Sequence, residues 1–292
     1  MERKAFIKNT LLTSLVTAVT PKVLLSDVLE AKPSTFDKLM HQVGFNHLPN
    51  NEKRTMNTVI HKSETRGHAN HGWLDSHHTF SFANYHNPER MNFGVLRVLN
   101  DDQVSPGQGF GTHPHDNMEI ISIPLEGDLE HKDSMGTLAV IKEGDIQVMS
   151  AGTGIYHSEY NRNKDKQVKF LQIWVFPNKK NVEPRYDQIS IKNIEKENAF
   201  YQVLSPNKDD QGVWINQDAW FNIGKFTKGH SDNYTINKKG NGVYAFVLEG
   251  EVEINGEPLL KRDGMGIWDT DTISVKATKD ARILLMEVPM SL

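Results

Sequence analysis

Two short segments of the chain hold the residues whose types and spacing are best suited to chemistry. Gly107–Gly127 contains His113, His115 and Glu119, and Gly144–Tyr160 contains His157 and Glu159. Residues two apart in a β-strand project from the same face. If both segments are strands, His113 and His115 share one face, and His157 and Glu159 share another. Two such strands facing each other would bring three imidazoles and one carboxylate to one point.

This set of donors predicts a transition-metal site. Three imidazoles with a carboxylate suit iron, copper, manganese or nickel better than a closed structural zinc site. The chain has no cysteine and 13 histidines, so disulfides, thiolate ligands and cysteine nucleophiles are excluded. Four protein ligands would leave one or two coordination positions open, which is what a catalytic metal needs.

Length and charge bound the remaining possibilities. The chain has 292 residues, enough for one large domain or two ordinary ones. Its net charge of −4 gives no basic footprint, so we expect no nucleic-acid partner.

Residues 1–55 form an N-terminal extension of a different character. A charged start with Arg3, Lys4 and Lys8 precedes an uncharged stretch that ends near Pro21. The stretch is too short for a membrane-spanning helix. It resembles a twin-arginine export signal with lysine in place of the second arginine, and an ordinary amphipathic helix is the alternative. The protein is therefore either exported to the periplasm or cytoplasmic.

The rest of the chain predicts an all-β fold built from two similar halves. Short runs of Val, Ile, Phe and Tyr alternate with turn residues, and Leu125-Glu126-Gly127 recurs as Leu248-Glu249-Gly250. We expect two small barrels in tandem, at residues 56–183 and 184–292. Ile236 in the second half occupies the place of His113 in the first. The second barrel is therefore degenerate and lacks the ligand set.

The two histidine motifs resemble those of a known protein family. Gly107, His113, His115 and Glu119 match the spacing of cupin motif one, and Gly144–His157 resembles motif two. Three segments are similar to the pirin family, whose bacterial branch includes quercetin 2,3-dioxygenases: Gly111–His115, Met149–Glu159 and His68–Phe82. The resemblance covers about Met56–Pro289. It implies a bicupin, two antiparallel jelly-roll β-barrels with one mononuclear metal in the first. The family's ligands fall on His113, His115, His157 and Glu159.

The resemblance also implies an activity. We expect a metal-dependent dioxygenase that cleaves a flavonol such as quercetin, or a similar phenol, with O2. The expected cofactor is Fe(II), with Cu, Mn, Ni, Co and Zn left open. Glu159 is our first candidate for the catalytic proton acceptor. Glu119 is the second, because its odd-numbered place would aim it to the side of His113 and His115.

Two other function classes remain open. One is a non-catalytic, redox-responsive regulatory protein with a protein partner. The other is an isomerase or hydrolase that uses the metal as a Lewis acid, because the cupin fold alone cannot decide the reaction.

A second group of histidines lies upstream of the motifs: His68, His71, His77, His78 and His86. We expect turn contacts or a place at the barrel mouth for most of them. Phe80 and Phe82 alternate, which predicts that they face a barrel interior, where they would line a substrate pocket.

Overall fold

The all-β prediction is confirmed by the computed structural model, which describes residues 56–291. These residues form 22 strands and two single-turn 3-10 helices, η1 (Ser63–Thr65) and η2 (Ile191–Asn193). The predicted export signal lies outside the described residues and stays a prediction. Within residues 56–291, no helix has the length and apolar character needed to cross a membrane.

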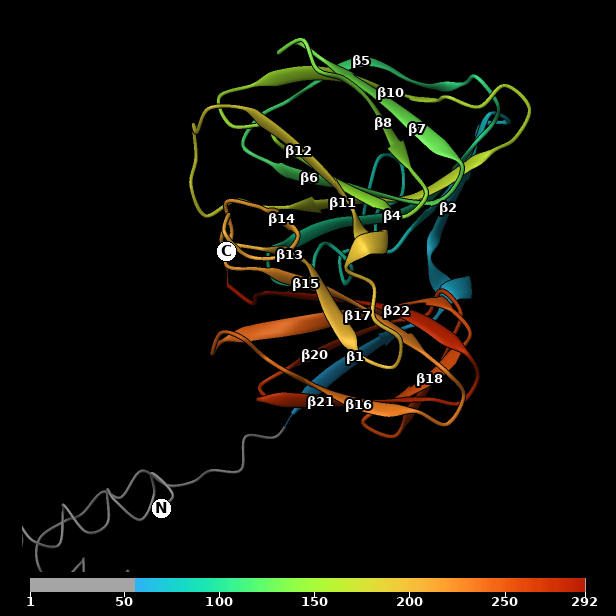
Figure 1. Ribbon diagram of the computed structural model, residues 1–292, viewed down its shortest axis with the longest axis vertical. Coiled ribbons are helices and arrows are strands. Elements are labelled where there is room, and N and C mark those ends of the chain that lie inside the picture. Colours follow the sequence, from blue (N-terminus) through green and yellow to red (C-terminus); the bar gives the residue numbers. More distant parts are fainter. Residues whose placement is uncertain (1–55, 292) are drawn as a thin grey trace, which may run out of the picture. The chain divides into compact units, whose positions relative to one another are not determined.

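The first barrel consists of a seven-stranded sheet, in the order β12-β9-β6-β11-β4-β3-β2, and a four-stranded sheet, in the order β5-β10-β7-β8 (Figure 1). Neighbouring strands in both sheets are antiparallel. The strands are β2 (Gly67–Asn70), β3 (Leu74–His78), β4 (Leu96–Val104), β5 (Gly109–His115), β6 (Glu119–Glu126), β7 (Asp128–Asp133), β8 (Leu138–Lys142), β9 (Asp145–Ser150), β10 (Ile155–Asn161), β11 (Val168–Val175) and β12 (Arg185–Ser190).

The second barrel repeats this plan. Its seven-stranded sheet has the order β1-β20-β17-β22-β15-β13-β14, and its four-stranded sheet has the order β16-β21-β18-β19. The strands are β1 (Asn57–His61), β13 (Phe200–Ser205), β14 (Val213–Trp214), β15 (Trp220–Phe226), β16 (Ser231–Thr235), β17 (Asn241–Glu249), β18 (Glu251–Ile254), β19 (Glu257–Leu260), β20 (Gly264–Trp268), β21 (Thr272–Ala277) and β22 (Ala281–Pro289).

The repeated Leu-Glu-Gly corner has the same geometry in both barrels. Gly127 joins β6 to β7 and Gly250 joins β17 to β18, each with a φ of +77°. A side chain is strained at such an angle. A Cβ at Gly250 would also lie 1.9 Å from the carbonyl oxygen of Asp280. Glycine is therefore required at this corner.

Two strands cross the division predicted at residue 183. β1 lies at the start of the folded body but pairs with β20 of the second barrel, and β12 pairs with β9 of the first. Each is the edge strand of a seven-stranded sheet. The barrels are thus tied together by an exchanged strand, which local sequence patterns do not reveal.

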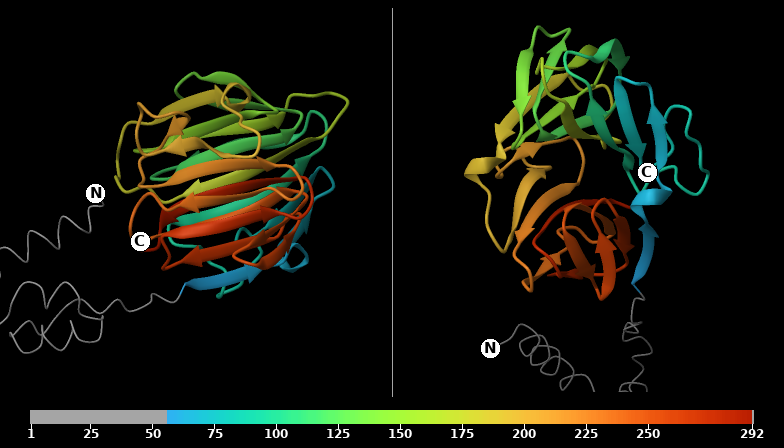
Figure 2. Two further views of the ribbon diagram at one scale, coloured as in Figure 1. Left: turned by 60° about the horizontal axis from the view of Figure 1, so that its bottom comes forward. Right: turned by 90° about the vertical axis from the view of Figure 1, so that its right-hand side faces the viewer.

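A shared hydrophobic core joins the barrels. Alternate residues of the first seven-stranded sheet, such as Ile121 and Ile123 of β6, pack with Leu284 and Met286 of β22. The same cluster includes Phe80, which lies against Tyr244 of β17 rather than in the barrel interior. The two seven-stranded sheets face each other across this core (Figures 1 and 2).

The two barrel interiors differ in polarity. In the second, inward residues of β21 are Ile273, Val275 and Ala277, which belong to an apolar cluster of 16 buried residues. The interior of the first barrel is interrupted by buried polar groups, among them His131, His157 and Glu159. The second barrel is thus mainly apolar inside, with a buried carboxylate, Glu287, whose oxygens accept hydrogen bonds from Tyr234 and Asn241. The first barrel instead contains the converging histidines.

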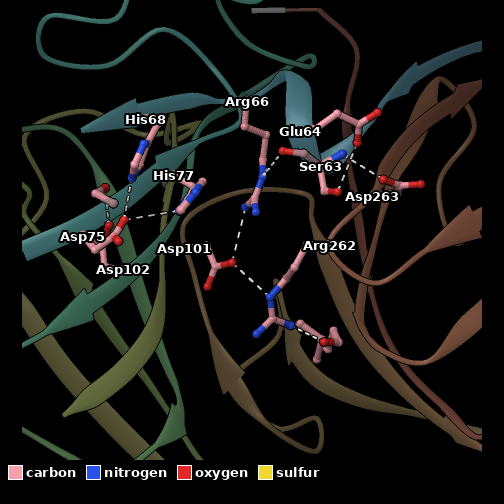
Figure 3. Close-up of polar contacts among 12 residues, drawn as sticks. Ser63, Glu64, Arg66, His68, Asp75, His77, Asp101, Asp102, Arg262 and Asp263 are labelled. Atoms are coloured by element: carbon pink, nitrogen blue, oxygen red, sulfur yellow. Dashed lines mark hydrogen bonds and ion pairs between the residues drawn. The ribbon is translucent and has the colours of Figure 1, made fainter. Parts of the chain in front are cut away.

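An ion-pair network crosses the interface beside the shared core (Figure 3). Asp101 of β4 accepts hydrogen bonds from Arg66 (Nη1–Oδ2, 3.3 Å) and from Arg262 of the second barrel (Nε–Oδ2, 2.9 Å). All three side chains are at most 16% exposed. Because two guanidinium groups depend on one carboxylate, Asp101 holds the barrels in register.

Removing this carboxylate should weaken the fold. In Asp101→Ala, two largely buried guanidinium groups lose their counter-ion, which we expect to lower the free energy of unfolding by about 2–4 kcal/mol. Urea denaturation monitored by tryptophan fluorescence measures the change. The control is Glu253→Ala, which breaks the exposed Lys276–Glu253 pair and should cost no more than about 0.5 kcal/mol. Equal effects of the two substitutions would contradict the assigned role.

Candidate metal centre

Two neighbouring strands of the four-stranded sheet bring the histidine motifs together. β10 pairs with β5 so that His157 lies opposite His113 and Ile155 opposite His115. Along β10, residues 155, 157, 159 and 161 are buried, and the residues between them are more exposed. This alternation points His157 and Glu159 into the barrel. The register shifts between these two residues, so Glu159 pairs with Phe110.

The three imidazoles of His113, His115 and His157 converge. One ring nitrogen from each lies within 4.8 Å of the other two, and the ring centroids are 4.4–4.9 Å apart. Nε2 of His157 is buried and has no hydrogen-bond partner among the described residues. A buried nitrogen without a partner is costly unless a ligand occupies the site. The cluster therefore fits a bound cation.

Hydrogen bonding and burial favour imidazole rings in which one nitrogen is unprotonated and can bind a metal. Nδ1 of His113 donates to the carbonyl oxygen of Gly111 at 2.7 Å, which leaves Nε2 unprotonated in the neutral ring. Burial lowers the pKa of His115 to about 4, with a smaller contribution from His113. Burial, reinforced by the neighbouring imidazoles, lowers the pKa of His157 to about 2. Both rings are neutral at physiological pH, and this is the form that binds metals.

Glu159 lies beside His157 but outside the group formed by His113, His115 and His157, and both of its oxygens accept hydrogen bonds. It accepts a hydrogen bond from Ser122 (Oγ–Oε1, 3.0 Å) and one from Gln172 (Nε2–Oε2, 2.7 Å). Its carboxylate forms a second group within 4.8 Å with His131 and His157. Burial raises the pKa of Glu159 to about 7, against the effect of the two hydrogen bonds. A cation bound nearby would favour the charged carboxylate.

Glu119 lies elsewhere, on the opposite face of the seven-stranded sheet. The turn at Asp116–Met118 carries the chain from β5 into the other sheet, so the odd–even pattern of β5 does not continue into β6. Glu119 accepts hydrogen bonds from Ser150 (Oγ, 2.7 Å) and from Asn216 of the second half (Nδ2, 3.1 Å). It faces the interface between the barrels, on the side of Ile121 and Ile123, and does not line the cavity described below.

His131, which the sequence patterns did not single out, contacts His157 and orients its ring. Nε2 of His131 donates to Asp133 at 3.0 Å, and Nδ1 of His131 lies 3.5 Å from Nδ1 of His157. Asp133 also accepts from the backbone amides of Met135 and Thr137, which favours its charged form. With neutral rings, His157 donates through Nδ1 to His131. This orientation turns Nε2 of His157 toward His113 and His115.

The imidazole cluster opens into a cavity of about 340 Å³ inside the first barrel. This volume lies within the range of small-molecule sites. Its walls include Phe82, Phe110 and Trp174, and Trp174 lies edge-on to His115 with ring centroids 4.9 Å apart. Phe82 thus lines the pocket as predicted, whereas Phe80 lies in the shared core.

The upstream histidines divide between the cavity and the surface. His68, His71 and His78 line the cavity, and His86 is exposed. His68 contacts Asp75 (Nε2–Oδ1, 2.8 Å), and its ring stacks on that of His77 (Figure 3). The three could approach one cation, but His68 and Asp75 already satisfy each other. Unlike Nε2 of His157, their contacting atoms do not call for a ligand.

Removing the charge of Glu119 should leave metal binding intact. Glu119→Gln keeps the side-chain size and lies on the far side of the sheet, so we expect the number of metal ions per chain to equal that of the wild type. Elemental analysis of the purified proteins measures this number. A loss of more than half of the bound metal would contradict the placement of Glu119 outside the site.

Replacing His131 should weaken metal binding without removing a ligand. His131→Phe keeps a planar ring but no longer accepts the hydrogen bond that orients His157, so we expect affinity to fall about 10- to 100-fold. Competition with a chelator of known affinity measures this change. His86→Ala is the matched control, because His86 is exposed and should leave the affinity unchanged. Equal affinities of His131→Phe and wild type would show that His131 does not orient His157.

Comparison with known proteins agrees with this architecture. The family model described as Pirin matches residues 31–175, and the quercetinase C-terminal cupin domain matches residues 202–288. The chain is 44% identical over 230 residues to quercetin 2,3-dioxygenase of Escherichia coli K12, covering 79% of this chain and 98% of that protein. It is 40% identical to a putative quercetin 2,3-dioxygenase of Pseudomonas aeruginosa, over 76% of this chain and 95% of that protein.

A solved structure gives the same result. The bacterial pirin YhhW from Escherichia coli, in complex with nickel(II), matches with a TM-score of 0.76 and 42% identity, covering 80% of this chain and 99% of that one. A sequence relative and a structural neighbour above 40% identity, both matched over nearly their full length, establish the relationship. The chain belongs to the pirin family.

Proposed function

We propose that the protein is a metal-dependent dioxygenase of the pirin type that cleaves a flavonol such as quercetin with O2. The observation that carries this proposal is the convergence of three imidazoles, one with an unpartnered buried nitrogen, on a cavity with aromatic walls. The relatives named quercetin 2,3-dioxygenase support the choice of reaction.

In this proposal, His113, His115, His157 and Glu159 hold one mononuclear metal ion, with Fe(II) as the natural cofactor. The imidazole nitrogens and the carboxylate are donors that several first-row ions accept, so Cu, Mn, Ni, Co and Zn are alternatives. The nickel(II) complex of the Escherichia coli pirin supports a metal at this type of site in the family. When bound, such an ion would lower the pKa of a coordinated hydroxyl and hold the resulting anion.

Side chains of the protein position the substrate and accept the proton of its hydroxyl group. Trp174, Phe82 and Phe110 offer apolar surfaces for a planar aromatic substrate in the cavity. Glu159 is the proposed acceptor of the hydroxyl proton, because its carboxylate lies beside His157. Ser122 and Gln172 fix the direction of this carboxylate. Glu119 has no part in the step, since it faces the other barrel.

Loss of an imidazole should abolish metal binding and turnover together. His113→Ala and His157→Ala each remove one of three converging nitrogens, so we expect metal content below about a tenth of the wild type. Their fold should be retained, because the shared apolar core does not include them. Elemental analysis, circular dichroism and an oxygen electrode with quercetin measure the three properties. His86→Ala should match the wild type in all of them.

Other results would select a different function. Oxygen consumption should depend on both quercetin and the added ion, with release of carbon monoxide. Retained metal without oxygen consumption on a broad flavonol panel would contradict the dioxygenase proposal and favour a regulatory protein. A reaction of the flavonol that proceeds without oxygen would favour a Lewis-acid isomerase or hydrolase. Full metal occupancy in both histidine variants would contradict the ligand assignment.

A further inference from the structure

A row of polar side chains crosses the seven-stranded sheet of the first barrel. Six residues on six adjacent strands are paired in register: Gln188, Gln147, Ser122, Gln172, Asn100 and His78. All except Gln188 are less than 9% exposed. A buried polar row in a sheet whose other face is apolar requires partners for its hydrogen-bonding groups.

Ser122 and Gln172, at the centre of the row, have hydrogen-bond partners. Ser122 and Gln172 hold the carboxylate of Glu159, as described above. Asn100 is the register partner of Gln172, and His78 is the register partner of Asn100. Since adjacent strands lie about 4.8 Å apart, His78 is two strand spacings, or roughly 10 Å, from Gln172. The row therefore leads from the metal centre to a distant point on the same wall.

That distant end has unmade hydrogen bonds. Oδ1 of Asn100 and Nδ1 of His78 are both buried, and neither has a partner within residues 56–291. Burial lowers the pKa of His78 to about 4, so its ring is neutral and one of its nitrogens carries a proton. Both residues line the cavity that contains His113 and His115. Each of these two atoms has less than 1 Å² of exposed surface, so a ligand hydroxyl reaches them only when the ring of His78 and the amide of Asn100 turn over about their terminal bonds. The N–H of the His78 ring would then donate to the hydroxyl, and the amide oxygen of Asn100 would accept from it.

An aromatic wall connects this end of the row to the metal centre. The ring of His115 contacts Trp174, Trp174 contacts Phe82, and Phe82 contacts His78, with ring centroids 4.9, 5.4 and 5.2 Å apart. Each contact is edge-to-face. A flat aromatic molecule bound at the imidazoles could therefore extend along this wall to His78 and Asn100.

A buried carboxyl group adds to the polarity of this region. Asp102 lines the cavity two residues beyond Asn100 on β4, and it accepts a hydrogen bond from Ser76 of β3. Burial raises the pKa of Asp102 to about 7. In either protonation state its oxygens can accept a further hydrogen bond from a phenol.

We propose that His78 and Asn100 form a hydroxyl-binding subsite at the end of the cavity remote from the metal centre. This inference rests on the proposed flavonol substrate and specifies which flavonols bind. The subsite selects those that carry a hydroxyl on the pendant ring, while the chelating oxygens occupy the imidazole end. His78 donates to this hydroxyl and Asn100 accepts from it.

The test compares two ligands and two variants. The ligands are a flavonol with two hydroxyls on the pendant ring and one with none, titrated without oxygen into the metal-loaded full chain while tryptophan fluorescence is recorded. We expect the wild type to bind the hydroxylated ligand about tenfold more tightly, as one or two hydrogen bonds allow. Asn100→Leu and His78→Phe should reduce this preference to about twofold or less, with the unsubstituted ligand bound as before.

Controls separate recognition from folding and from turnover. Asn233→Leu makes the same substitution at an exposed position of β16 and should keep the wild-type preference. Metal content and circular dichroism report the fold of each variant, and His78→Phe decides the test if Asn100→Leu does not fold. The preference of the wild type for the hydroxylated flavonol is measured without any variant. If the wild type binds both flavonols equally, that result alone overturns the subsite.

The outcomes distinguish the two proposals. An unchanged preference in a folded variant would overturn the subsite and leave the dioxygenase proposal standing. Selective binding that disappears in the variants, without oxygen consumption by the wild type, would support the subsite and contradict the dioxygenase proposal. Failure to bind either flavonol would overturn both.

Discussion

The structure depends on the alternation of side chains between the two faces of one seven-stranded sheet. On one face, residues such as Ile121 and Ile123 complete the apolar core shared with the second barrel. On the other, Gln172 and Asn100 present polar groups to the cavity, and Ser122 donates a hydrogen bond to Glu159. The apolar core on one face holds the strands in position. The polar side chains on the other face can therefore keep their places even where some of their hydrogen bonds are completed only by a ligand. Stability and chemistry thus come from opposite faces of the same strands.

The second barrel explains how the first can tolerate a polar interior. Both barrels share the same strand order and the same glycine corner, yet β21 fills its barrel with Ile273, Val275 and Ala277 where β10 carries His157 and Glu159. The second barrel contributes a second core and one side of the shared interface. The exchange of β1 and the Arg66–Asp101–Arg262 network fix the two barrels in register. A duplicated fold has therefore been divided into a supporting half and a half with a candidate site.

The sequence was informative where the relevant geometry is local. The two-residue spacing determines the face of a strand and so predicts that His113, His115 and His157 point into one interior, where the structure brings them together. That these imidazoles and Glu159 hold one metal ion stays a prediction. The repeated corner predicts the tandem architecture. Glu119 was misplaced because three turn residues carry the chain into another sheet, where counting from β5 has no meaning. His131, Asn100 and the exchanged β1 depend on pairing between distant strands. Their local patterns are those of ordinary strands, so only the three-dimensional register reveals their roles.

The central claim is that one metal ion lies between His113, His115 and His157, with part of its coordination sphere open to the cavity. Anomalous diffraction from crystals of the metal-loaded protein, recorded above and below the absorption edge of the ion, tests this claim most directly. The account predicts a single strong anomalous peak within bonding distance of one nitrogen from each of the three imidazoles, on the side that faces Trp174. A peak at another position, or no peak among these imidazoles after loading, would contradict it.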